Sequence, residues 1–423
     1  MNYKECLDYI HSLLRFGSKP GLSRISYLLD RLGNPQKKLR IIHIAGTNGK
    51  GSTAVMVQSI CSAAGYKTGL YISPFVTDFC ERIQVDGNYI NENELCEITQ
   101  KIREAAQTLN NTDPVTEFEF ITALAFECFV QKKCDVVVLE TGLGGRFDAT
   151  NVVEKPLVSV ITRIGLDHQN VLGDSIEKIA FEKSGIIKSR CPVVVSSHQP
   201  ECALEVIRAE CKNKKSPLFL NCLPSFSSCT VGVSGNEFVF DSSVYKSGLI
   251  GTHQFDNAAN AITAVEVSGL KIKQSDIVEG LSKAFLPARS EILSTEPIVI
   301  LDGSHNIDGI ASLSDLLRQL NINKITAIIG MMADKSISDA LRQISPLCKD
   351  IVTVTVEDNP RSACATQLAS ICSEFNDNVH IATDYDNAIK TAIQLANGGP
   401  IVVFGSLYLS GGIRQSLINT FKC

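Results

Sequence analysis

The sequence lacks several features that mark specialised classes of protein. None of its apolar runs reaches the roughly 18 residues of a membrane-spanning helix, so we expect no membrane association. The N-terminal stretch has the pattern of an amphipathic helix and lacks the apolar core and cleavage site of a signal peptide. There is no basic cluster, and the formal net charge is −5, which argues against nucleic-acid binding. We find neither a short repeat nor a low-complexity tract.

The spacing C-x-x-C is also missing, although the chain holds 15 cysteines. An odd number of cysteines without metal-ligand spacing indicates neither a disulfide framework nor a metal site. Many of them, such as Cys61, Cys128 and Cys134, stand in helical or strand patterns. We therefore expect small buried side chains in a protein of the reducing cytoplasm.

What the chain does have is length and alternating elements. With 423 residues, 44% of them hydrophobic and 20% charged, it is expected to form two or three soluble domains. Apolar, β-branched runs alternate with helical patterns, which predicts a doubly wound α/β sheet. Residues 1–40 should be mostly helical, and residues 73–86 should form a functional loop. The first half contains predicted strands at 41–45, 70–72, 136–139, 157–161 and 193–195, and predicted helices at 53–64, 91–109 and 118–131.

The second half shows a change of pattern and then another α/β set. Short alternating strands between residues 218 and 247 suggest antiparallel pairing, and a helix is expected near 257–268. Residues 287–289 look like a linker. Further strands are predicted at 298–301, 325–329, 351–356, 379–382 and 401–404. We predict a doubly wound domain over 1–290 and a smaller, Rossmann-like α/β domain over 291–423.

The stretch Ile41–Thr53, IIHIAGTNGKGST, carries the clearest local signal. An apolar strand gives way to a loop of glycines, one lysine and hydroxyl groups: Gly46, Thr47, Gly49, Lys50, Gly51, Ser52 and Thr53. Glycines let backbone N–H groups surround an oxyanion, lysine neutralises phosphate, and a hydroxyl beyond it can bind Mg²⁺. The spacing departs from G-x-x-x-x-G-K-[ST], because Ile44 stands at the first glycine position. We interpret it as a phosphate-binding P-loop of a less common subtype; a glycine-rich turn is the alternative.

Polar groups follow two predicted strands of the first half. In open α/β sheets ligands bind at the carboxyl ends of strands. Glu140 ends one strand, and an acid downstream of a phosphate loop is the usual holder of Mg²⁺; a solvated strand cap is the alternative. His168 follows another strand, and we favour a metal ligand over a structural histidine, although Mg²⁺ prefers oxygen.

Other positions carry weaker signals. Asp302 and His305 follow the strand 298–301, where they could reach a ribose and a nucleotide. Arg289, in the linker, could swing toward a terminal phosphate. Asp174 is expected to cap a helix, with Glu177 completing a capping box. Lys183, near the end of that helix, reads on bare chemistry as a solvated or dipole-neutralising lysine.

Together these residues resemble the folylpolyglutamate synthase and dihydrofolate synthase family, a branch of the Mur ligase superfamily. The resemblance covers nearly the whole chain. The stretches that carry it are GLSRISYLLDRLGNPQ, HIAGTNGKGST, SPFVTDFCERI, LETGLGGRFDATN, IGLDH, EKSGIIK, HQFDNAANA, PAR, DGSHN and GSLYLSGG.

The resemblance implies an ATP- and Mg²⁺-dependent amide ligase, with catalytic roles for Lys50, Lys183, His168 and Arg289. Two Mg²⁺ ions would lie among Ser52, Ser73, Glu140, His168 and Lys183. Members of the family carry a carbamylated lysine where Lys183 stands. The nucleotide would contact Thr47, Asn48, Gly49, Lys50, Gly51, Ser52 and Thr53, with Gln254 and Asn257 on the adenine side and Arg289, Asp302 and His305 closing from the linker and second domain.

Three positions depart from the family pattern. Phe75 stands where histidine is usual after Ser-Pro, Ala288 replaces the glycine of PGR, and Phe147 replaces a leucine. The alanine is expected to stiffen the linker. Phe75 bears on the loop that would meet the substrate.

The function that the resemblance implies is transfer of L-glutamate to tetrahydrofolate through an acyl phosphate, extending to dihydropteroate. Dihydrofolate synthase alone and a cell-wall Mur-type ligase are the alternatives. A P-loop nucleotide switch is a reading from another class, disfavoured because a switch needs no closing second domain. We expect a monomer and leave a monovalent cation open.

Overall fold

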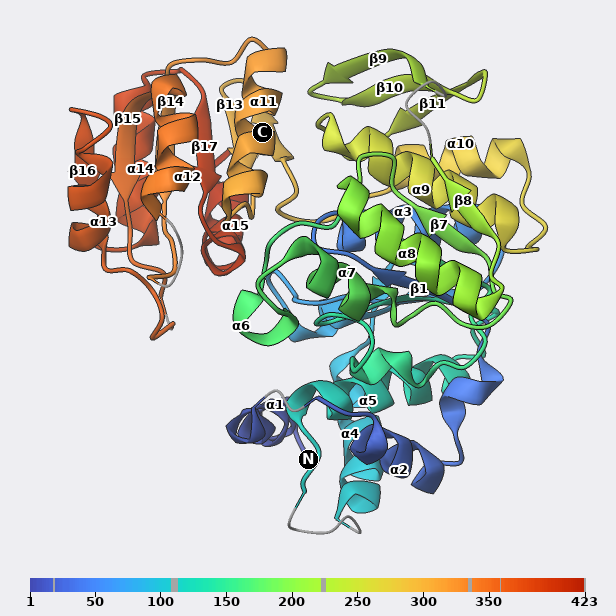
Figure 1. Ribbon diagram of the computed structural model, residues 1–423. Coiled ribbons are helices and arrows are strands. Elements are labelled where there is room, and N and C mark those ends of the chain that lie inside the picture. The colour runs from blue at the N-terminus through green and yellow to red at the C-terminus, as the bar shows by residue number, and fades with distance from the viewer. Residues whose placement is uncertain (18–19, 108–112, 222–225, 334–336, 358, 422–423) are drawn as a thin grey trace.

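The computed structural model describes residues 1–17, 20–107, 113–221, 226–333, 337–357 and 359–421. Two α/β units account for most of these residues, and a small antiparallel sheet lies over the larger unit (Figure 1). The predicted fold class is confirmed by an eight-stranded mixed sheet and a separate six-stranded sheet. Within these ranges, no helix is long and apolar enough to cross a bilayer.

The larger sheet has the strand order β4-β3-β2-β5-β1-β6-β7-β8. Six strands run parallel, from β2 to β8, while β3 and β4 extend the sheet antiparallel. Because β1 lies between β5 and β6, the loop after β1 opens at the centre of the carboxyl edge. The strands are β1 (Ile41–Ala45), β2 (Thr68–Tyr71), β3 (Ile83–Val85), β4 (Asn88–Tyr89), β5 (Val136–Glu140), β6 (Val158–Ile161), β7 (Val193–Val195) and β8 (Leu218–Leu220).

The central strands are mostly apolar because both faces of the sheet are covered. In β1, Ile42 and Ile44 belong to the hydrophobic cluster on one face, whereas Ile41 belongs to the cluster on the other. Successive side chains of a strand point to opposite faces, so a continuous apolar run fills two cores at once.

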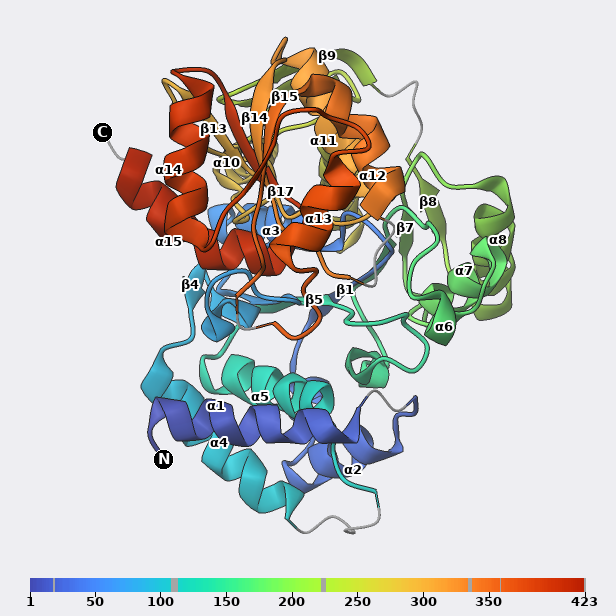
Figure 2. The ribbon, with the colours of Figure 1, turned by 90° about the vertical axis from the view of Figure 1, so that its left-hand side faces the viewer.

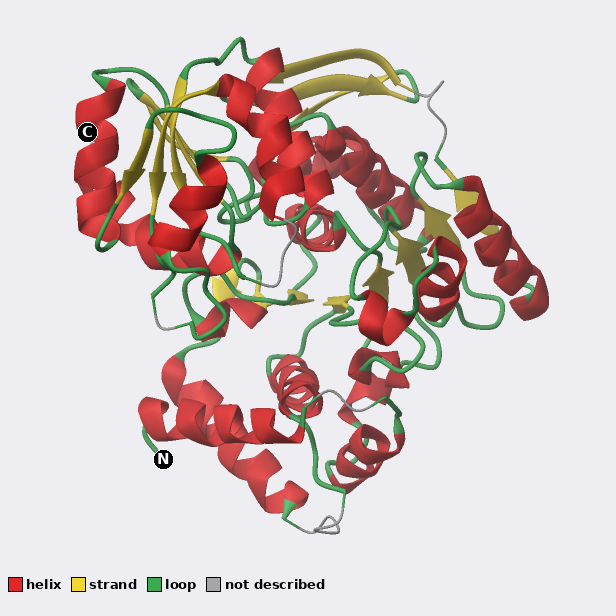
Figure 3. Ribbon diagram, turned by 60° about the vertical axis from the view of Figure 1, so that its left-hand side comes forward, coloured by secondary structure: helices red, strands yellow, loops and turns green. Residues whose placement is uncertain are grey.

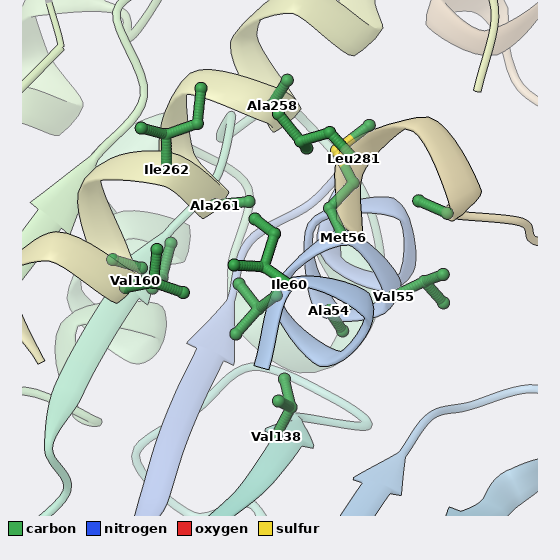
Figure 4. Packing of buried hydrophobic residues seen from close by; sticks show 14 of the residues in the cluster. Ala54, Val55, Met56, Ile60, Val138, Val160, Ala258, Ala261, Ile262 and Leu281 are labelled. Atoms are coloured by element: carbon green, nitrogen blue, oxygen red, sulfur yellow. The ribbon is translucent and has the colours of Figure 1, made fainter. Parts of the chain in front are cut away.

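Helices α3 (Lys50–Ala63), α9 (His253–Val267) and α10 (Gln274–Lys283) cover the first face. Figure 4 shows α3 between the strands and these two helices, with Met56 and Ile60 pointing into the shared core. The crossing of α10 over α3 is close: a Cβ at Gly280 would lie 2.4 Å from the Cα of Ile60. Only glycine allows the two backbones to approach this closely.

The second face is covered by the N-terminal helices and a helical pair from the middle of the chain, which Figure 3 shows as a separate layer. Their apolar stripes meet around Leu28, Leu95, Phe120 and Phe126. The elements are α1 (Tyr3–Ser12), η1 (Leu13–Phe16), α2 (Ser23–Arg31), η2 (Pro35–Lys38), α4 (Glu92–Ala106) and α5 (Glu117–Gln131).

The β6–β8 end of the larger sheet has its own cover. Helices α7 (Ile176–Ser184) and α8 (Glu201–Lys214) pack there, with α6 (Gln169–Leu172) preceding them and η4 (Ala149–Val152) following β5. The small antiparallel sheet consists of β9 (Phe226–Gly232), β10 (Gly235–Phe240) and β11 (Ser243–Ser247). Its Phe238 and Tyr245 stack at 5.5 Å between ring centroids and join the core of α3 and α9.

The second unit has the strand order β12-β13-β17-β14-β15-β16, with only β12 antiparallel. Helices α11, α12 and α13 cover one face and α14 and α15 the other (Figure 1). The strands are β12 (Glu291–Thr295), β13 (Ile298–Leu301), β14 (Ile325–Ile329), β15 (Cys348–Thr353), β16 (Val379–Ile381) and β17 (Ile401–Phe404). The helices are α11 (Ile307–Gln319), α12 (Ile337–Ile344), η6 (Ser345–Leu347), α13 (Ala365–Cys372), α14 (Tyr385–Ala396) and α15 (Leu407–Phe421).

The segment that joins the units is buried, unlike an ordinary flexible linker. Ala288 is fully buried and takes a left-handed φ of +52°. Its N–H donates to Glu291 Oε2 at 3.0 Å, and its carbonyl accepts from the Gly303 N–H at 2.8 Å. The segment Pro287–Arg289 is therefore held on both sides by the second unit.

Four expectations about the elements need correction or completion. Only the start of the segment 73–86 is a loop, because η3 (Phe79–Arg82) and β3 follow it. Strand β8 pairs in parallel with β7, so within the segment 218–247 only β9–β11 pair antiparallel. The helix predicted to start at Asp174 begins after Ser175, and the Ser175 hydroxyl accepts a hydrogen bond from the Lys178 N–H. Asp174 instead forms an ion pair with the Lys178 side chain. The expected capping box between Asp174 and Glu177 is therefore not formed. Strand β12 was not predicted, and residues 108–109 and 222–225 of predicted elements lie outside the described residues.

Candidate active site

The glycine loop after β1 forms an open helix N-terminus. Gly49 is the N-cap of α3 with a φ of +85°, and no side chain of the described residues caps the helix there. A Cβ at Gly49 would lie 2.2 Å from Asn257 Oδ1, so this position admits only glycine. The N–H groups of the first turn and the positive end of the helix dipole are available to an anion.

The loop is anchored to the segment that follows the neighbouring strand β6. The N–H groups of Thr47 and Asn48 both donate to the Arg163 carbonyl, at 2.9 and 3.2 Å. The Thr47 hydroxyl donates to the Gly165 carbonyl at 3.1 Å, and Lys50 Nζ lies 3.3 Å from the Thr47 carbonyl oxygen. The lysine side chain is thus folded over its own loop, where a phosphate would displace the carbonyl contact.

Glu140 lies at the end of β5 against this loop. It is buried, and its Oε2 accepts the Ser73 N–H at 3.1 Å and lies 3.6 Å from the Cβ position of Gly51. Burial raises the pKa of Glu140, although Lys50, the Ser73 N–H and Arg289 act in the opposite direction. Its other oxygen, Oε1, accepts no hydrogen bond from any described residue. Ser73 and Glu140, both predicted metal ligands, are therefore in contact.

Lys183 is buried and points into the P-loop. Its Nζ donates to the Gly46 carbonyl at 2.7 Å. Burial, followed by the nearby charge of Lys50, lowers the pKa of Lys183 from 10.5 to about 7, against the attraction of Asp167 and Asp148. The reading as a solvated surface lysine is wrong, because the α7 backbone packs against Gly145 and places the side chain inside.

Helix α9 supplies the other wall of the loop. Gln254 Nε2 donates to Ser52 Oγ at 3.4 Å, and Asn257 Nδ2 donates to Gln254 Oε1 at 2.9 Å. Thr53 Oγ1 lies 3.5 Å from Asn257 Oδ1. These buried amides tie α9 to the start of α3, so the two predicted nucleotide contacts on α9 do lie beside the P-loop.

His168 differs from the other predicted ligands in exposure. It adopts a left-handed φ of +50° before α6, and 56% of its side chain is exposed. Its Nε2 lies 3.7 Å from the Asp167 carboxylate. The structure therefore shows it at the rim of the carboxyl edge, and its role as a metal ligand stays a prediction.

The second unit brings three predicted residues toward this edge. Arg289 is close enough to Glu140 to affect its pKa and approaches Gly303. Asp302 is buried and already accepts hydrogen bonds from the N–H and hydroxyl groups of both Ser290 and Ser304. His305 Nδ1 lies 2.9 Å from the Gly303 carbonyl. In this conformation the Asp302 carboxylate shapes the turn between β13 and α11, which positions its neighbours.

The oxygen ligands available at the start of α3 are consistent with one magnesium site. Hard cations such as Mg²⁺ prefer oxygen ligands, and the uncommitted Glu140 oxygen and the Ser52 hydroxyl both lie at the start of α3. Among the described residues, no group of three or more His, Cys, Asp or Glu side chains is placed to hold a metal ion. A nucleotide phosphate would have to complete the coordination, as is usual for Mg²⁺.

Sequence reasoning gave no role to two residues near this site. Arg82 packs its guanidinium over the rings of Phe75 and Phe79, at 5.2 and 5.6 Å from their centroids. The buried Arg82 Nε and Thr141 Oγ1 have no hydrogen-bond partner among the described residues. The stretch ERI, and the position of Thr141 directly after Glu140, were the available signals.

Two family models match the chain. The Mur ligase middle domain matches residues 44–265, and the glutamate ligase domain of Mur ligases matches residues 288–407. A Bacillus subtilis (strain 168) protein named dihydrofolate synthase/folylpolyglutamate synthase is 38% identical over 434 residues, covering 98% of this chain and 99% of its own.

Solved structures match over nearly the full length. Mycobacterium tuberculosis folylpolyglutamate synthase complexed with ADP has a TM-score of 0.89 at 30% identity, covering 97% of this chain and 98% of its own. Escherichia coli FolC in complex with DHPP and ADP has a TM-score of 0.85 at 31% identity, covering 98% of each chain.

Proposed function

This chain belongs to the folylpolyglutamate synthase/dihydrofolate synthase family of Mur ligases, and we propose that it joins L-glutamate both to tetrahydrofolate and to dihydropteroate. It is an ATP-dependent glutamate ligase. The observation that carries the proposal is the arrangement at the start of α3, where the buried Glu140 lies against Gly51 of the P-loop and both Lys50 and Arg289 are close enough to lower its pKa. Two cations and a helix N-terminus there face the position that the phosphates would occupy.

The chemistry we propose proceeds in two steps. The substrate carboxylate attacks the γ-phosphate of ATP, which gives an acyl phosphate and ADP. The amino group of L-glutamate then attacks the acyl carbon, so that the amide bond forms and inorganic phosphate and a proton are released. Lys50, Arg289 and the first-turn N–H groups of α3 would hold the phosphates and offset their charge. Mg²⁺, held by Glu140 and Ser52, would neutralise further phosphate charge when bound. Gln254 and Asn257 support the loop and would lie on the adenine side.

Lys183 is proposed to be carbamylated. Carbamylation needs the neutral amine, and a pKa of about 7 leaves much of this side chain neutral at physiological pH, whereas an ordinary lysine is almost entirely protonated. The resulting anion would add oxygen ligands beside Lys50 and Glu140. With Ser73 and His168, it would form the second of the two metal sites that we expect.

We also propose that residues 1–290 and 291–423 act as two domains that close on ATP and glutamate. Asp302 and His305 would meet the nucleotide from the second domain. The units are already in contact: for example, the Cβ position of Gly165 lies 3.2 Å from Asp308 Oδ2, and Ala288 is buried in the second unit. Closure would keep water from the acyl phosphate. We further propose a monomer in the cytoplasm, and a monovalent cation as a third ion remains to be tested.

The choice of acceptor is supported by the relatives. The Bacillus subtilis protein is named for both activities, and the Escherichia coli structure holds DHPP together with ADP. The decisive experiment measures ADP release by the purified protein with ATP, Mg²⁺ and L-glutamate, offering tetrahydrofolate in one reaction and 7,8-dihydropteroate in another. Release with both acceptors is expected.

The other outcomes identify the alternatives. Release with one acceptor only would make the protein a folylpolyglutamate synthase or a dihydrofolate synthase, and release without any acceptor would indicate a nucleotide switch. Silence with both, in protein that binds ADP, would point to a cell-wall ligase. Lys50→Ala is the control, since it should abolish release without altering the folded state.

A further inference from the structure

The loop between β2 and η3 is organised by one buried carboxylate. Glu81 is 3% exposed and accepts four hydrogen bonds: from the N–H groups of Val76, Thr77 and Asp78 and from the Thr77 hydroxyl, at 2.6 to 2.9 Å. A carboxylate that bonds several consecutive N–H groups fixes the path of that backbone. The three N–H groups therefore face Glu81, and the conformation of the loop depends on this side chain.

The opposite side of the same loop meets helix α15 of the second unit. A Cβ at Gly411 would lie 1.8 Å from the Val76 carbonyl oxygen, so the helix and the loop backbone are in direct contact. The Val76 side chain packs against the hydrophobic cluster that contains Leu301, Leu407 and Ile413 of the second unit. Figure 2 shows α15 lying over this part of the first unit, next to β4.

Charge on α15 matches charge around the loop. Arg414, one turn beyond Gly411, binds Glu291 through two nitrogens at 2.6 to 3.2 Å. Hydrogen bonds to Glu291 raise the pKa of Arg414, and the charge of Glu81 adds to this effect. The guanidinium therefore joins α15 to β12 and adds positive charge near the carboxylate that organises the loop.

The loop begins at the reaction centre. The N–H of Ser73 donates to Glu140, and Phe75 packs on the first unit beside Arg82. Between Ser73 and Val76 the chain therefore contacts Glu140 beside the P-loop, the core of the first unit and the core of the second unit. Movement of α15 away from Val76 would release one side of this segment.

We propose that Glu81 and Gly411 are positioning residues that couple docking of the second unit to the reaction: α15 presses on the Val76 carbonyl, Glu81 transmits that constraint along the loop, and Ser73 holds Glu140 in place. This inference rests on the proposed ligase function. It adds a structural condition, because the site reaches its reactive geometry only when α15 is docked.

The test compares Gly411→Ala with Gly412→Ala in the full-length protein. Both add one methyl group to neighbouring positions of α15, but the Cβ at Gly412 would meet Tyr385 within the second unit, 2.5 Å from its ring, and does not meet the loop. Gly411→Ala should lower kcat by at least about tenfold, because ångström-scale displacement of reacting groups has large effects. The KM for ATP and the affinity for ADP should change less than about twofold, since the P-loop is untouched. Gly412→Ala should stay close to wild type.

Hydrogen exchange supplies a readout that does not depend on turnover. The N–H groups of residues 76–78 should exchange faster in Gly411→Ala and in Glu81→Gln than in wild type, and Glu81→Asp should be intermediate. Equal kcat in Gly411→Ala and wild type, or unchanged exchange of these amides in both Gly411→Ala and Glu81→Gln, would overturn the proposal. If the wild-type protein had no ligase activity, the proposed function would fail while the exchange comparison still tested the contact.

Discussion

Two glycines with nearly identical φ have different surroundings. Gly49 and Gly65 have φ of +85° and +84°, yet a Cβ at Gly49 would collide with Asn257, whereas a Cβ at Gly65 would lie more than 4 Å from every described residue other than its chain neighbours. Gly49→Ala should therefore weaken ADP binding by at least about tenfold, because the start of α3 must shift. Gly65→Ala carries the same backbone strain without the collision and should bind ADP as wild type does. Titration calorimetry with ADP checks both; equal affinities would show that the crowding has no effect on the nucleotide site.

Lys183 should make stability depend on pH in a predictable direction. Its pKa is about 7 in the folded protein and 10.5 as an ordinary lysine, so between these values the unfolded chain binds more protons and stability rises with pH. Compared with Lys183→Met, the wild type should gain up to about 1.4 kcal/mol per pH unit in this window. Urea unfolding of both proteins at pH 7, 8 and 9, in bicarbonate-free buffer to prevent carbamylation, measures the difference. A difference that stays constant with pH would contradict the lowered pKa.

Residues whose partners are close in sequence were the easiest to predict. The P-loop is contiguous, so its glycines and Lys50 predict a phosphate site by themselves. Glu140 is predicted as a metal ligand from its place at the end of an apolar strand. Lys183 could not be placed in this way. Its burial depends on α7 packing against Gly145, which no local pattern specifies, and only the family resemblance gave it a role.

At the scale of elements, an ion pair joins two helices of the N-terminal layer. Arg24 on α2 and Glu119 on α5 are buried and contact through Arg24 Nε at 3.1 Å to both carboxylate oxygens. Arg24→Ala would leave Glu119 buried without its cation and should reduce the free energy of unfolding by about 3 kcal/mol. Urea unfolding followed by circular dichroism measures this loss.

A control lies on the same helix. Arg31→Ala removes an exposed arginine of α2 whose contacts are with Tyr27, and should leave the urea midpoint unchanged. If the two substitutions had equal effects, the stability of the layer would not depend on the buried pair. Adding Glu119→Gln to Arg24→Ala should recover part of the loss, because the uncompensated charge is removed.

Strands buried on both faces were predicted well, since their apolar runs have no other simple explanation. Two edge strands were predicted less well than β16, which was expected at 379–382 and is present at Val379–Ile381. Strand β12, EILST, mixes polar and apolar residues and forms an open edge of the six-stranded sheet. Strand β8 forms an edge of the larger, eight-stranded sheet. Turn residues near β9–β11 correctly indicated antiparallel pairing, but they could not show where that pairing begins. Strand β8 runs parallel to β7 because helix α8 connects the two strands, and the turn residues do not indicate this direction.

For the whole molecule, the sequence indicated the fold class and a second α/β set, but not how the two meet. The contact between Val76 and Gly411 joins residues from nearly opposite ends of the chain, and neither residue type draws attention. The burial of Ala288 could not be predicted either, since the sequence Pro-Ala-Arg is typical of a linker. All thirteen cysteines within the described ranges are free, and nine of them are buried. The expectation of buried side chains is wrong for Cys229, which is exposed, and is met only in part by Cys134, Cys202 and Cys364, which are half-buried.

The crossing of α10 over α3 at Gly280 has a mechanical consequence. Helix α10 runs directly into the segment that leads to Ala288, and its backbone lies against the helix that begins at the P-loop. The start of the segment that joins the two units is thus packed firmly against the helix that begins at the phosphate loop. In the domain closure that we propose, rotation of the second unit would begin beyond Lys283, so the position of Arg289 would be set relative to the helix that carries the phosphate loop. A short connecting segment that starts from a fixed helix would bring the second unit to the same closed position in every turnover.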